Sequence, residues 1–320
     1  MTTTIARPPF DPELEAALVV MAEQMPPTLT AEMIPLMRAR PLAPPMDEQL
    51  AGRDLEWTDF TIPGYLGADI VVTVIKKRGH AGTGPGIYHI HGGGMIIGDR
   101  SLGAVQLADW VERYDAVAVT VEYRLAPEFP DPYPVEDSYA GLVWTADHAA
   151  ELGIDPERLI VVGGSAGGGL AAGVALLARD RSGPPLAGQL LMCPMLDDRD
   201  ASVSTAQIDG VGVWDRASNV VGWTALLGDR KGTDDVSIYA APARATDLSG
   251  LPSTFIDCGS AEVFRDEDVA YATGIWAAGG QAELHVWAGG FHGFEVVAHA
   301  SVSIAATAAR ESWVARILAT

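Results

Sequence analysis

The chain has 320 residues, of which 48% are hydrophobic, and its formal net charge is −21, with 21 basic residues of which only three are lysine. This length suits one large α/β domain, and so acidic a chain without any basic run is a poor partner for nucleic acid or for an anionic membrane surface. The N-terminus lacks the apolar stretch of a signal peptide, and no apolar run reaches the roughly 18 residues of a membrane span. We therefore expect a cytoplasmic protein with neither nucleic acid nor membrane as a partner.

Residues 1–50 differ in character from the rest of the chain. Asp11 followed by Pro12 is typical of a helix start, and Thr30 is placed to cap a second short helix. Six prolines between positions 26 and 45 keep such helices short. We expect a small helical segment ahead of the main domain.

The remainder of the chain alternates apolar strand patterns with helical patterns. Strands are predicted near 54–62, 69–75, 87–90, 116–121, 159–162, 188–193, 253–258 and 283–287, and helices near 101–114, 135–151, 166–180, 264–279 and 296–318. Alternation of strand and helix from residue 87 onward predicts an α/β fold with a mostly parallel sheet covered on both faces. The first two strands are joined closely enough for an antiparallel pair. Residues 197–250 interrupt this rhythm.

A glycine-flanked serine stands at one of the strand-to-helix junctions. The sequence Gly-Gly-Ser-Ala-Gly at 163–167 follows the apolar run 159–162 and precedes a helical pattern rich in small residues. A serine on so tight a turn is held in a strained backbone conformation. The positions two before and two after it must lack side chains so that helix and strand can approach. Ser165 is therefore the candidate nucleophile.

A second glycine-rich turn, His-Gly-Gly-Gly at 91–94, directly follows the predicted strand 87–90. Backbone N–H groups in such a loop can point at a reacting carbonyl group and stabilise the oxyanion that forms there. The N–H groups of Gly92 and Gly93, together with that of Ala166 at the start of the next helix, are the candidate oxyanion hole. His91 is expected to order this loop.

The acid and the base of a triad are expected after the last two strands. Glu262 lies just past strand 253–258 and is the favoured acid, while Asp257 within the strand and Asp266 one helical turn further are the alternatives. His292 follows the final strand and is the candidate general base. The chain order serine, acid, histidine is the order found in α/β hydrolases.

Several blocks of sequence extend this agreement beyond the serine turn. They are His-Gly-Gly-Gly-Met-Ile-Ile-Gly-Asp (91–99), Tyr-Arg-Leu-Ala-Pro-Glu (123–128), Tyr-Pro-Val-Glu-Asp-Ser-Tyr-Ala (133–140), Gly-Gly-Ser-Ala-Gly-Gly (163–168), Phe-Arg-Asp-Glu (264–267) and Phe-His-Gly-Phe (291–294). As a set they resemble the hormone-sensitive-lipase-like carboxylesterases of bacteria. Two positions depart from that pattern: Gly164 replaces the usual Asp before the nucleophile, and Glu262 begins Glu-Val-Phe in place of Asp-Pro-Leu.

The resemblance implies an α/β-hydrolase fold with an eight-stranded sheet and a helical cap. Residues 1–50 would supply cap helices, residues 51–320 the catalytic domain, and residues 197–250 a second part of the cap. The implied activity is that of a serine carboxylesterase, which hydrolyses short- to medium-chain esters of small molecules through an acyl-enzyme. The resemblance also leaves a homodimer open.

Two other classes of function stay open. An amide-bond hydrolase of the aryl formamidase or acyl-peptide hydrolase type would use the same triad. A non-catalytic ligand-binding receptor predicts a damaged triad, and His292 argues against it. No histidine or carboxylate cluster has a metal-ligand spacing such as H-E-x-x-H, so we expect no cofactor and no metal. Cys193 and Cys258 are expected to be inert buried thiols.

Overall fold

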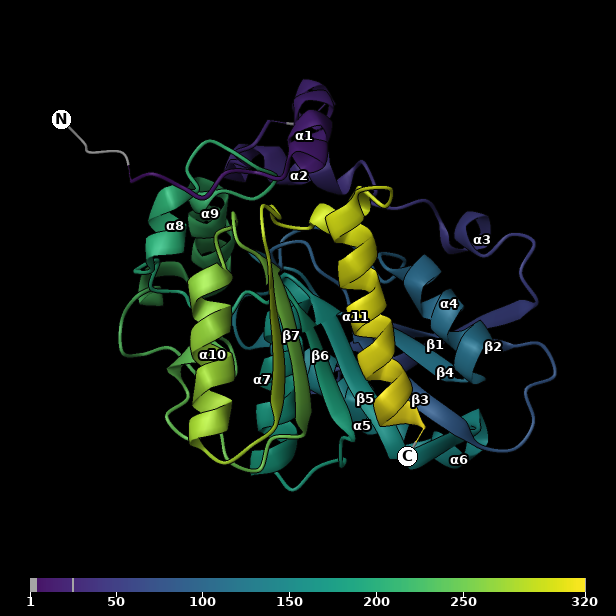
Figure 1. The fold of residues 1–320 in the computed structure, drawn as a ribbon. Coiled ribbons are helices and arrows are strands. Elements are labelled where there is room, and N and C mark those ends of the chain that lie inside the picture. The colour runs from purple at the N-terminus through teal and green to yellow at the C-terminus, as the bar shows by residue number, and fades with distance from the viewer. Residues whose placement is uncertain (1–4, 25, 320) are drawn as a thin grey trace.

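An eight-stranded sheet organises the fold of the computed structural model, which describes residues 5–24 and 26–319 (Figure 1). Its strands are β1 (Leu55–Pro63), β2 (Asp69–Lys77), β3 (Gly84–Ile90), β4 (Val117–Glu122), β5 (Ile154–Gly164), β6 (Gly188–Met192), β7 (Ser253–Gly259) and β8 (Ala282–Trp287). Their spatial order is β1-β2-β4-β3-β5-β6-β7-β8. The pairs β1–β2 and β2–β4 are antiparallel, and the five that follow are parallel. The predicted mostly parallel α/β-hydrolase sheet is confirmed.

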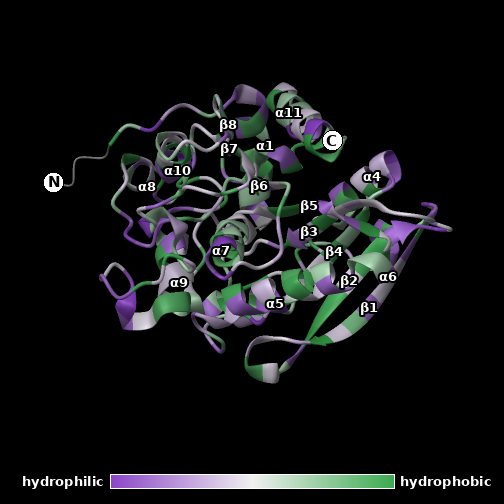
Figure 2. Cartoon of the chain, turned by 90° about the horizontal axis from the view of Figure 1, so that it is seen from below, coloured by the Kyte–Doolittle hydropathy of each residue, from purple (hydrophilic) through white to green (hydrophobic). Residues whose placement is uncertain are grey.

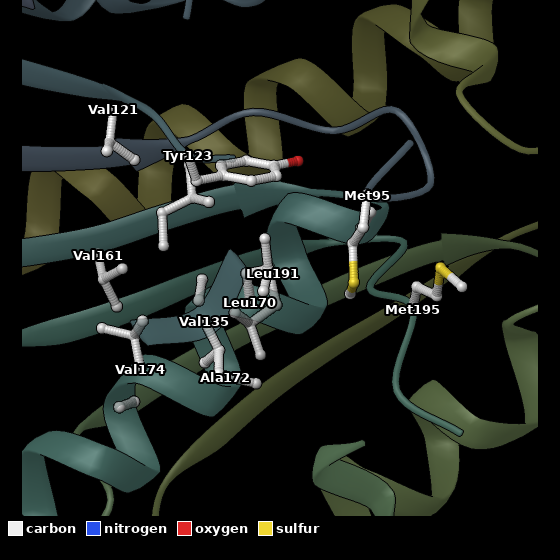
Figure 3. Close-up of a cluster of buried hydrophobic side chains, with 14 of the residues drawn as sticks. Met95, Val121, Tyr123, Val135, Val161, Leu170, Ala172, Val174, Leu191 and Met195 are labelled. Carbon is white, nitrogen blue, oxygen red and sulfur yellow. The ribbon is translucent and has the colours of Figure 1, made fainter. Parts of the chain in front are cut away.

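Helices cover both faces of the sheet. The helices α4 (Ala104–Tyr114) and α11 (Ser301–Leu318) pack on one face, and α5 (Tyr133–Asp147), α6 (Ala149–Leu152), α7 (Ala166–Asp180) and α10 (Arg265–Ala277) pack on the other. Successive side chains of a strand point to opposite faces, so Ile160 packs with α4 and α11 while Val161 packs with α7. Figure 3 shows Val161 near Leu170 and Val174 of α7. Both faces of the central strands are therefore apolar, as the uninterrupted hydrophobic runs predict.

The colouring in Figure 2 follows this arrangement. Hydrophobic residues lie along β2, β3 and β4, and hydrophilic residues lie at the far end of α4. The buried sheet thus gives a rigid base from which the loops after the strands project.

The remaining helices come mostly from the first 50 residues and from residues 197–250. They are α1 (Pro12–Gln24), η1 (Ala31–Met33), α2 (Ile34–Arg38), α3 (Met46–Gln49), η2 (Tyr65–Gly67), α8 (Val203–Gln207), α9 (Arg216–Leu227), η3 (Gly228–Arg230), η4 (Pro242–Arg244) and η5 (Phe294–Val296). Figure 1 shows α1 and α2 above one end of the sheet, near α8 and α9. This is the end at which the parallel strands finish and from which the loops with the candidate residues start.

Two expectations about helix starts in the N-terminal segment have different outcomes. Asp11 precedes α1 as expected, and its Oδ1 accepts hydrogen bonds from the N–H groups of Glu13 (2.8 Å) and Leu14 (3.4 Å). Thr30 precedes η1, but its side chain makes no capping hydrogen bond, so that part of the expectation is wrong.

Candidate active site

Ser165 stands on the turn between β5 and α7 in a conformation that side chains rarely adopt. Its backbone angles are φ 57° and ψ −124°, and its N–H donates to the Met192 carbonyl at 2.8 Å. A Cβ at Gly163 would lie 2.1 Å from the Gly167 oxygen, and one at Gly167 would lie 2.1 Å from the Ile90 oxygen. Glycine is required at both places, because the helix and two strands converge there. The strained turn presents the serine at the end of the sheet.

The three candidate residues Ser165, His292 and Glu262 form one hydrogen-bonded chain. The Ser165 Oγ lies 2.9 Å from His292 Nε2, and His292 Nδ1 lies 2.7 Å from Glu262 Oε2. Since Glu262 is a carboxylate acceptor, Nδ1–H donates to it, which leaves Nε2 to accept the serine proton. Glu262 follows Ser165 by 97 positions in the sequence, and His292 follows Glu262 by 30. The ends of β5, β7 and β8 bring these three residues together.

The Glu262 carboxyl is almost completely buried behind the histidine, with 1% of its surface exposed. Its second oxygen, Oε1, accepts a hydrogen bond from the Gly259 N–H at 2.6 Å. Burial raises the pKa of this carboxyl, and the hydrogen bonds from His292 and Gly259 oppose the rise by stabilising the anion. Each oxygen of Glu262 therefore has its own N–H donor.

The two alternative acids make other contacts. Asp257 Oδ2 accepts hydrogen bonds from Arg310 Nε at 2.9 Å and Trp287 Nε1 at 3.0 Å. Asp266 accepts from the Ser204 N–H and from the neighbouring arginine side chain, both at 2.8 Å. Of the three candidate acids, Glu262 is the one in contact with His292.

The glycine loop at 91–94 lies against the serine turn. A Cβ on Gly92 would stand 2.8 Å from the Gly164 oxygen and 3.4 Å from the Ser165 Cβ. Gly93 has φ +111°, and a Cβ there would meet the Ile97 carbonyl oxygen at 2.1 Å. Ala166 is the first residue of α7, where N–H groups have no partner within the helix. The N–H groups expected to form an oxyanion hole thus belong to backbone segments that meet at Ser165.

His91 connects the glycine loop to Tyr123. Its ring stacks on Tyr123, with centroids 4.2 Å apart and planes 14° apart, and its Nδ1 lies 2.8 Å from the Gly92 oxygen. The Tyr123 hydroxyl donates to the His91 carbonyl at 2.9 Å. Burial lowers the pKa of His91, so the ring stays neutral. This geometry agrees with the interpretation that His91 orders the loop.

A cavity of about 960 Å³ opens onto Ser165 and His292. One side of it is apolar and is lined from the N-terminal segment and from residues 213–214, by Leu29, Met33, Met37, Leu42, Val213 and Trp214. The other side lies between α4 and α11 and includes Gln106, Asp109, Trp110, Thr307, Arg310 and Glu311. The cavity can hold a small organic molecule with its reacting group at the serine.

Comparison with known proteins identifies the family. Residues 87–296 match the family described as alpha/beta hydrolase fold. The chain belongs to this family. The bacterial heroin esterase has 38% sequence identity with this α/β hydrolase, and its structure superposes with a TM-score of 0.89 over 97% of this chain and 98% of that one. The resemblance to hormone-sensitive-lipase-like carboxylesterases is confirmed.

Two curated relatives extend the comparison. Carboxylesterase NlhH of Mycobacterium tuberculosis is 37% identical over 291 residues, which cover 88% of this chain and 87% of that protein. Arylacetamide deacetylase of Bos taurus is 26% identical over 80% of this chain and 77% of that protein. The similarity therefore includes most of the hydrolase and reaches well beyond the motifs around the triad.

Two side chains attach the outer segments of this hydrolase to the site. Arg38 donates from Nε to the Ile96 carbonyl and from Nη2 to the Ala126 carbonyl, both at 2.7 Å, and pairs with Glu128 at 2.9 Å. Asp215 caps α9 through the Ser218 N–H at 2.8 Å and accepts from the Thr28 hydroxyl at 2.6 Å. The sequence carries no signal for the contacts of Arg38 and for the contact between Thr28 and Asp215, because these partners lie between 58 and 187 positions apart.

Two groups of buried side chains in the hydrolase bring possible metal ligands within 4.8 Å of one another. They are Cys193, Glu262 and His292, and Cys258, Glu262 and Asp268. Both groups include Glu262, whose two oxygens already accept hydrogen bonds. A metal ion bound by the first group would take the His292 nitrogen or the Glu262 oxygen that the chain from Ser165 to Glu262 uses. Separately, none of the helices in the described part of the chain is long and apolar enough to cross a membrane.

Proposed function

We propose that this hydrolase is a serine carboxylesterase with Ser165 as nucleophile, His292 as general base and Glu262 as the acid that orients the histidine. The observation that supports this most directly is the hydrogen-bonded chain from Ser165 Oγ to Glu262 Oε2, which opens onto the cavity. A serine hydroxyl is a weak nucleophile unless a base removes its proton during attack. The order and the spacing of these three groups supply such a base.

The reaction then proceeds in two halves. His292 Nε2 takes the hydroxyl proton as Ser165 Oγ bonds to the ester carbonyl carbon, and the N–H groups of Gly92, Gly93 and Ala166 stabilise the oxyanion. His292 gives this proton to the leaving alcohol as the ester C–O bond breaks and an acyl-enzyme remains. Water then attacks the acyl group, His292 accepts a proton from it, and the carboxylic acid leaves as Ser165 regains its proton.

Short- to medium-chain esters of small molecules are the proposed substrates. Support comes from the apolar side of the cavity, where three flexible side chains, Met33, Met37 and Leu42, can adapt to different acyl chains. We propose that residues 1–50 and 197–250 act as the two parts of a cap and that residues 51–320 form the catalytic domain. The contacts of Arg38 and Asp215 hold these segments over the glycine loop.

Amide hydrolysis is the second candidate activity. A relative at 26% identity is named a deacetylase of arylacetamides, and the same triad can expel an amine when His292 protonates it. A receptor without catalytic activity is disfavoured, because the complete hydrogen-bonded triad would serve no purpose in it.

We also propose a cytoplasmic location and a homodimer. Support for self-association comes from the open edge of the sheet at β8, where Val286 is 40% and the nearby Trp276 of α10 is 47% exposed. Light scattering of the purified protein distinguishes a dimer from a monomer.

A panel of nitrophenyl esters from acetate to palmitate, with a nitroanilide beside them, tests the proposed activity. We expect the highest kcat/KM for acyl groups of about 2 to 8 carbons and a much lower value for the anilide, since the amine is the poorer leaving group. The Ser165→Ala variant is the control for contaminating activity. A preference for the anilide would favour the second candidate, and no turnover of any member would contradict both.

A further inference from the structure

A second buried carboxyl group lies directly behind the proposed triad acid. Asp268 of α10 is 0% exposed, and among the described residues its two buried carboxyl oxygens have no hydrogen-bond partner other than the weak donor Cys258. A carboxyl oxygen of Asp268, one of Glu262 and the Cys258 sulfur all lie within 4.8 Å of one another. A buried carboxyl group with so weak a partner is unusual and calls for an explanation, because burial without compensation is costly.

The charged groups around Asp268 would not stabilise a negative charge on it in addition to the charge on Glu262. The nearest acids, Glu262, Glu267 and Asp257, all raise the pKa of the Asp268 carboxyl, in addition to the larger effect of its burial. Arg310, a buried cation of α11 on the opposite face of the sheet, is paired with Asp257 at 2.9 Å and with Glu295 at 3.5 Å. The Cys258 thiol is only a weak hydrogen-bond donor. Two carboxylates this close in a dry site cannot both be ionised, so the pair holds one proton.

The hydrogen bonds decide which of the two carboxyl groups holds that proton. Glu262 accepts N–H bonds at both oxygens, from Gly259 at 2.6 Å and from His292 at 2.7 Å, and such bonds favour its anion. Asp268 has only the Cys258 thiol, a weak donor, to favour its anion. The proton therefore belongs on Asp268, and the negative charge belongs on Glu262.

We propose that Asp268 is a positioning residue of the active site: a neutral carboxylic acid whose dipole and O–H group stabilise the Glu262 carboxylate beside it. The proposal rests on the triad described above. When His292 takes up the serine proton, the imidazolium then faces one negative charge instead of two. A second charge would make His292 hold its proton to higher pH and would move the acid limb of the kcat/KM profile upward.

Two substitutions separate this role from simple packing. Asp268→Ala removes the dipole and should lower kcat about 10-fold with little change in KM, in line with the loss of one hydrogen-bonding group near a developing charge. Asp268→Asn stays neutral and keeps a donor, so it should recover most of that loss and leave the acid limb in place. An Asn variant whose acid limb moves down by about one pH unit would contradict the proposal, because it would mean that Asp268 is ionised in the native enzyme.

An infrared measurement tests the protonation state without relying on activity. The difference spectrum of the wild type minus Asp268→Asn at neutral pH should contain the carbonyl stretch of a protonated carboxylic acid. Its absence would overturn the proposal even if the esterase reaction is as described. Conversely, an active Ser165→Ala variant would overturn the proposed function and leave the infrared result standing.

Discussion

Glu262, the proposed triad acid, stands where the pattern of the family that the sequence resembles has an aspartate. Glu262 comes three residues after the end of that strand and turns back, so that its Oε1 accepts the N–H of Gly259, the last strand residue. This contact fixes the carboxylate while Oε2 reaches His292.

Replacing Glu262 by glutamine tests this assignment. The amide keeps the shape but can present its NH₂ to Nδ1, which favours the wrong tautomer of the histidine, so kcat should fall by up to about 10⁴-fold. Asp266→Asn, four positions on, is the matched control and should stay within about 3-fold of the wild type because its partners are Ser204 and Arg265. Steady-state rates on one nitrophenyl ester suffice. The reverse ranking of the two variants would move the triad acid to Asp266.

The positions of Ser165, Glu262 and His292 could be predicted from the sequence because each one follows a strand, and the ends of parallel strands meet at one edge of a sheet. Asp268 could not be singled out in this way. It is one of three successive acids at the start of α10, and only the packing of that helix decides which of them faces the triad. A local sequence pattern therefore locates the proposed triad residues but not a buried side chain that packs against them, such as Asp268.

At the scale of elements, the outer helices are attached to the sheet by a few polar contacts. Arg38 at the end of α2 reaches two carbonyl groups, one in the turn after the glycine loop and one in the segment that follows β4. Thr28 and Leu29 are bound to Asp215 and Ser218 at the start of α9. The strands could be predicted from hydrophobic runs, whereas the attachment of the outer helices depends on contacts between distant parts of the chain. The predicted helix 135–151 is likewise divided into α5 and α6 at His148, which the periodicity alone does not indicate.

Removing the Arg38 contacts should weaken the attachment of α2, which lines the cavity, and leave the proposed triad unchanged. For Arg38→Gln we expect KM for a medium-chain ester to rise about 3- to 10-fold with a smaller change in kcat, as fits the loss of partly exposed charged hydrogen bonds. Arg40→Gln, at an exposed position two residues on, is the matched control. An equal change of KM in both variants, or a loss of kcat alone, would argue against a role of α2 in binding.

At the scale of the whole molecule, buried titratable groups set the dependence of stability on pH. Burial raises the pKa of Asp257, Glu262, Glu267 and Asp268, so the folded chain keeps protons that the unfolded chain releases above about pH 4. Each pKa unit of such a rise costs about 1.4 kcal/mol of stability once the pH exceeds the native value. Burial acts in the opposite sense on histidine, and it lowers the pKa of His89 to about 3.

These shifts predict that stability falls as the pH rises above neutrality. Between about pH 4 and pH 6.5 two effects oppose each other: the unfolded chain binds protons on His89 and His91 that the folded chain does not bind, and the folded chain keeps protons on buried acids that the unfolded chain has lost. Above about pH 6.5 the two histidines no longer contribute, and the protons held on buried acids such as Asp268 make stability fall as the pH rises. The midpoint of thermal unfolding should therefore fall between about pH 7 and pH 9, and Asp268→Asn should reduce that fall. Calorimetry at constant ionic strength measures both. A midpoint that rises over this interval would contradict the account.

The most direct test of the central claim, that Ser165 is the nucleophile of an ester hydrolase, is covalent trapping. A fluorophosphonate reacts with an activated serine and leaves a stable phosphonyl group on its Oγ. Intact-mass and peptide mass spectrometry should find one such group per chain, on the peptide that contains Ser165, with esterase activity lost in the same proportion. The Ser165→Ala variant should take up none. Full inactivation with the adduct on another residue, or undiminished activity in a chain labelled at Ser165, would contradict the account.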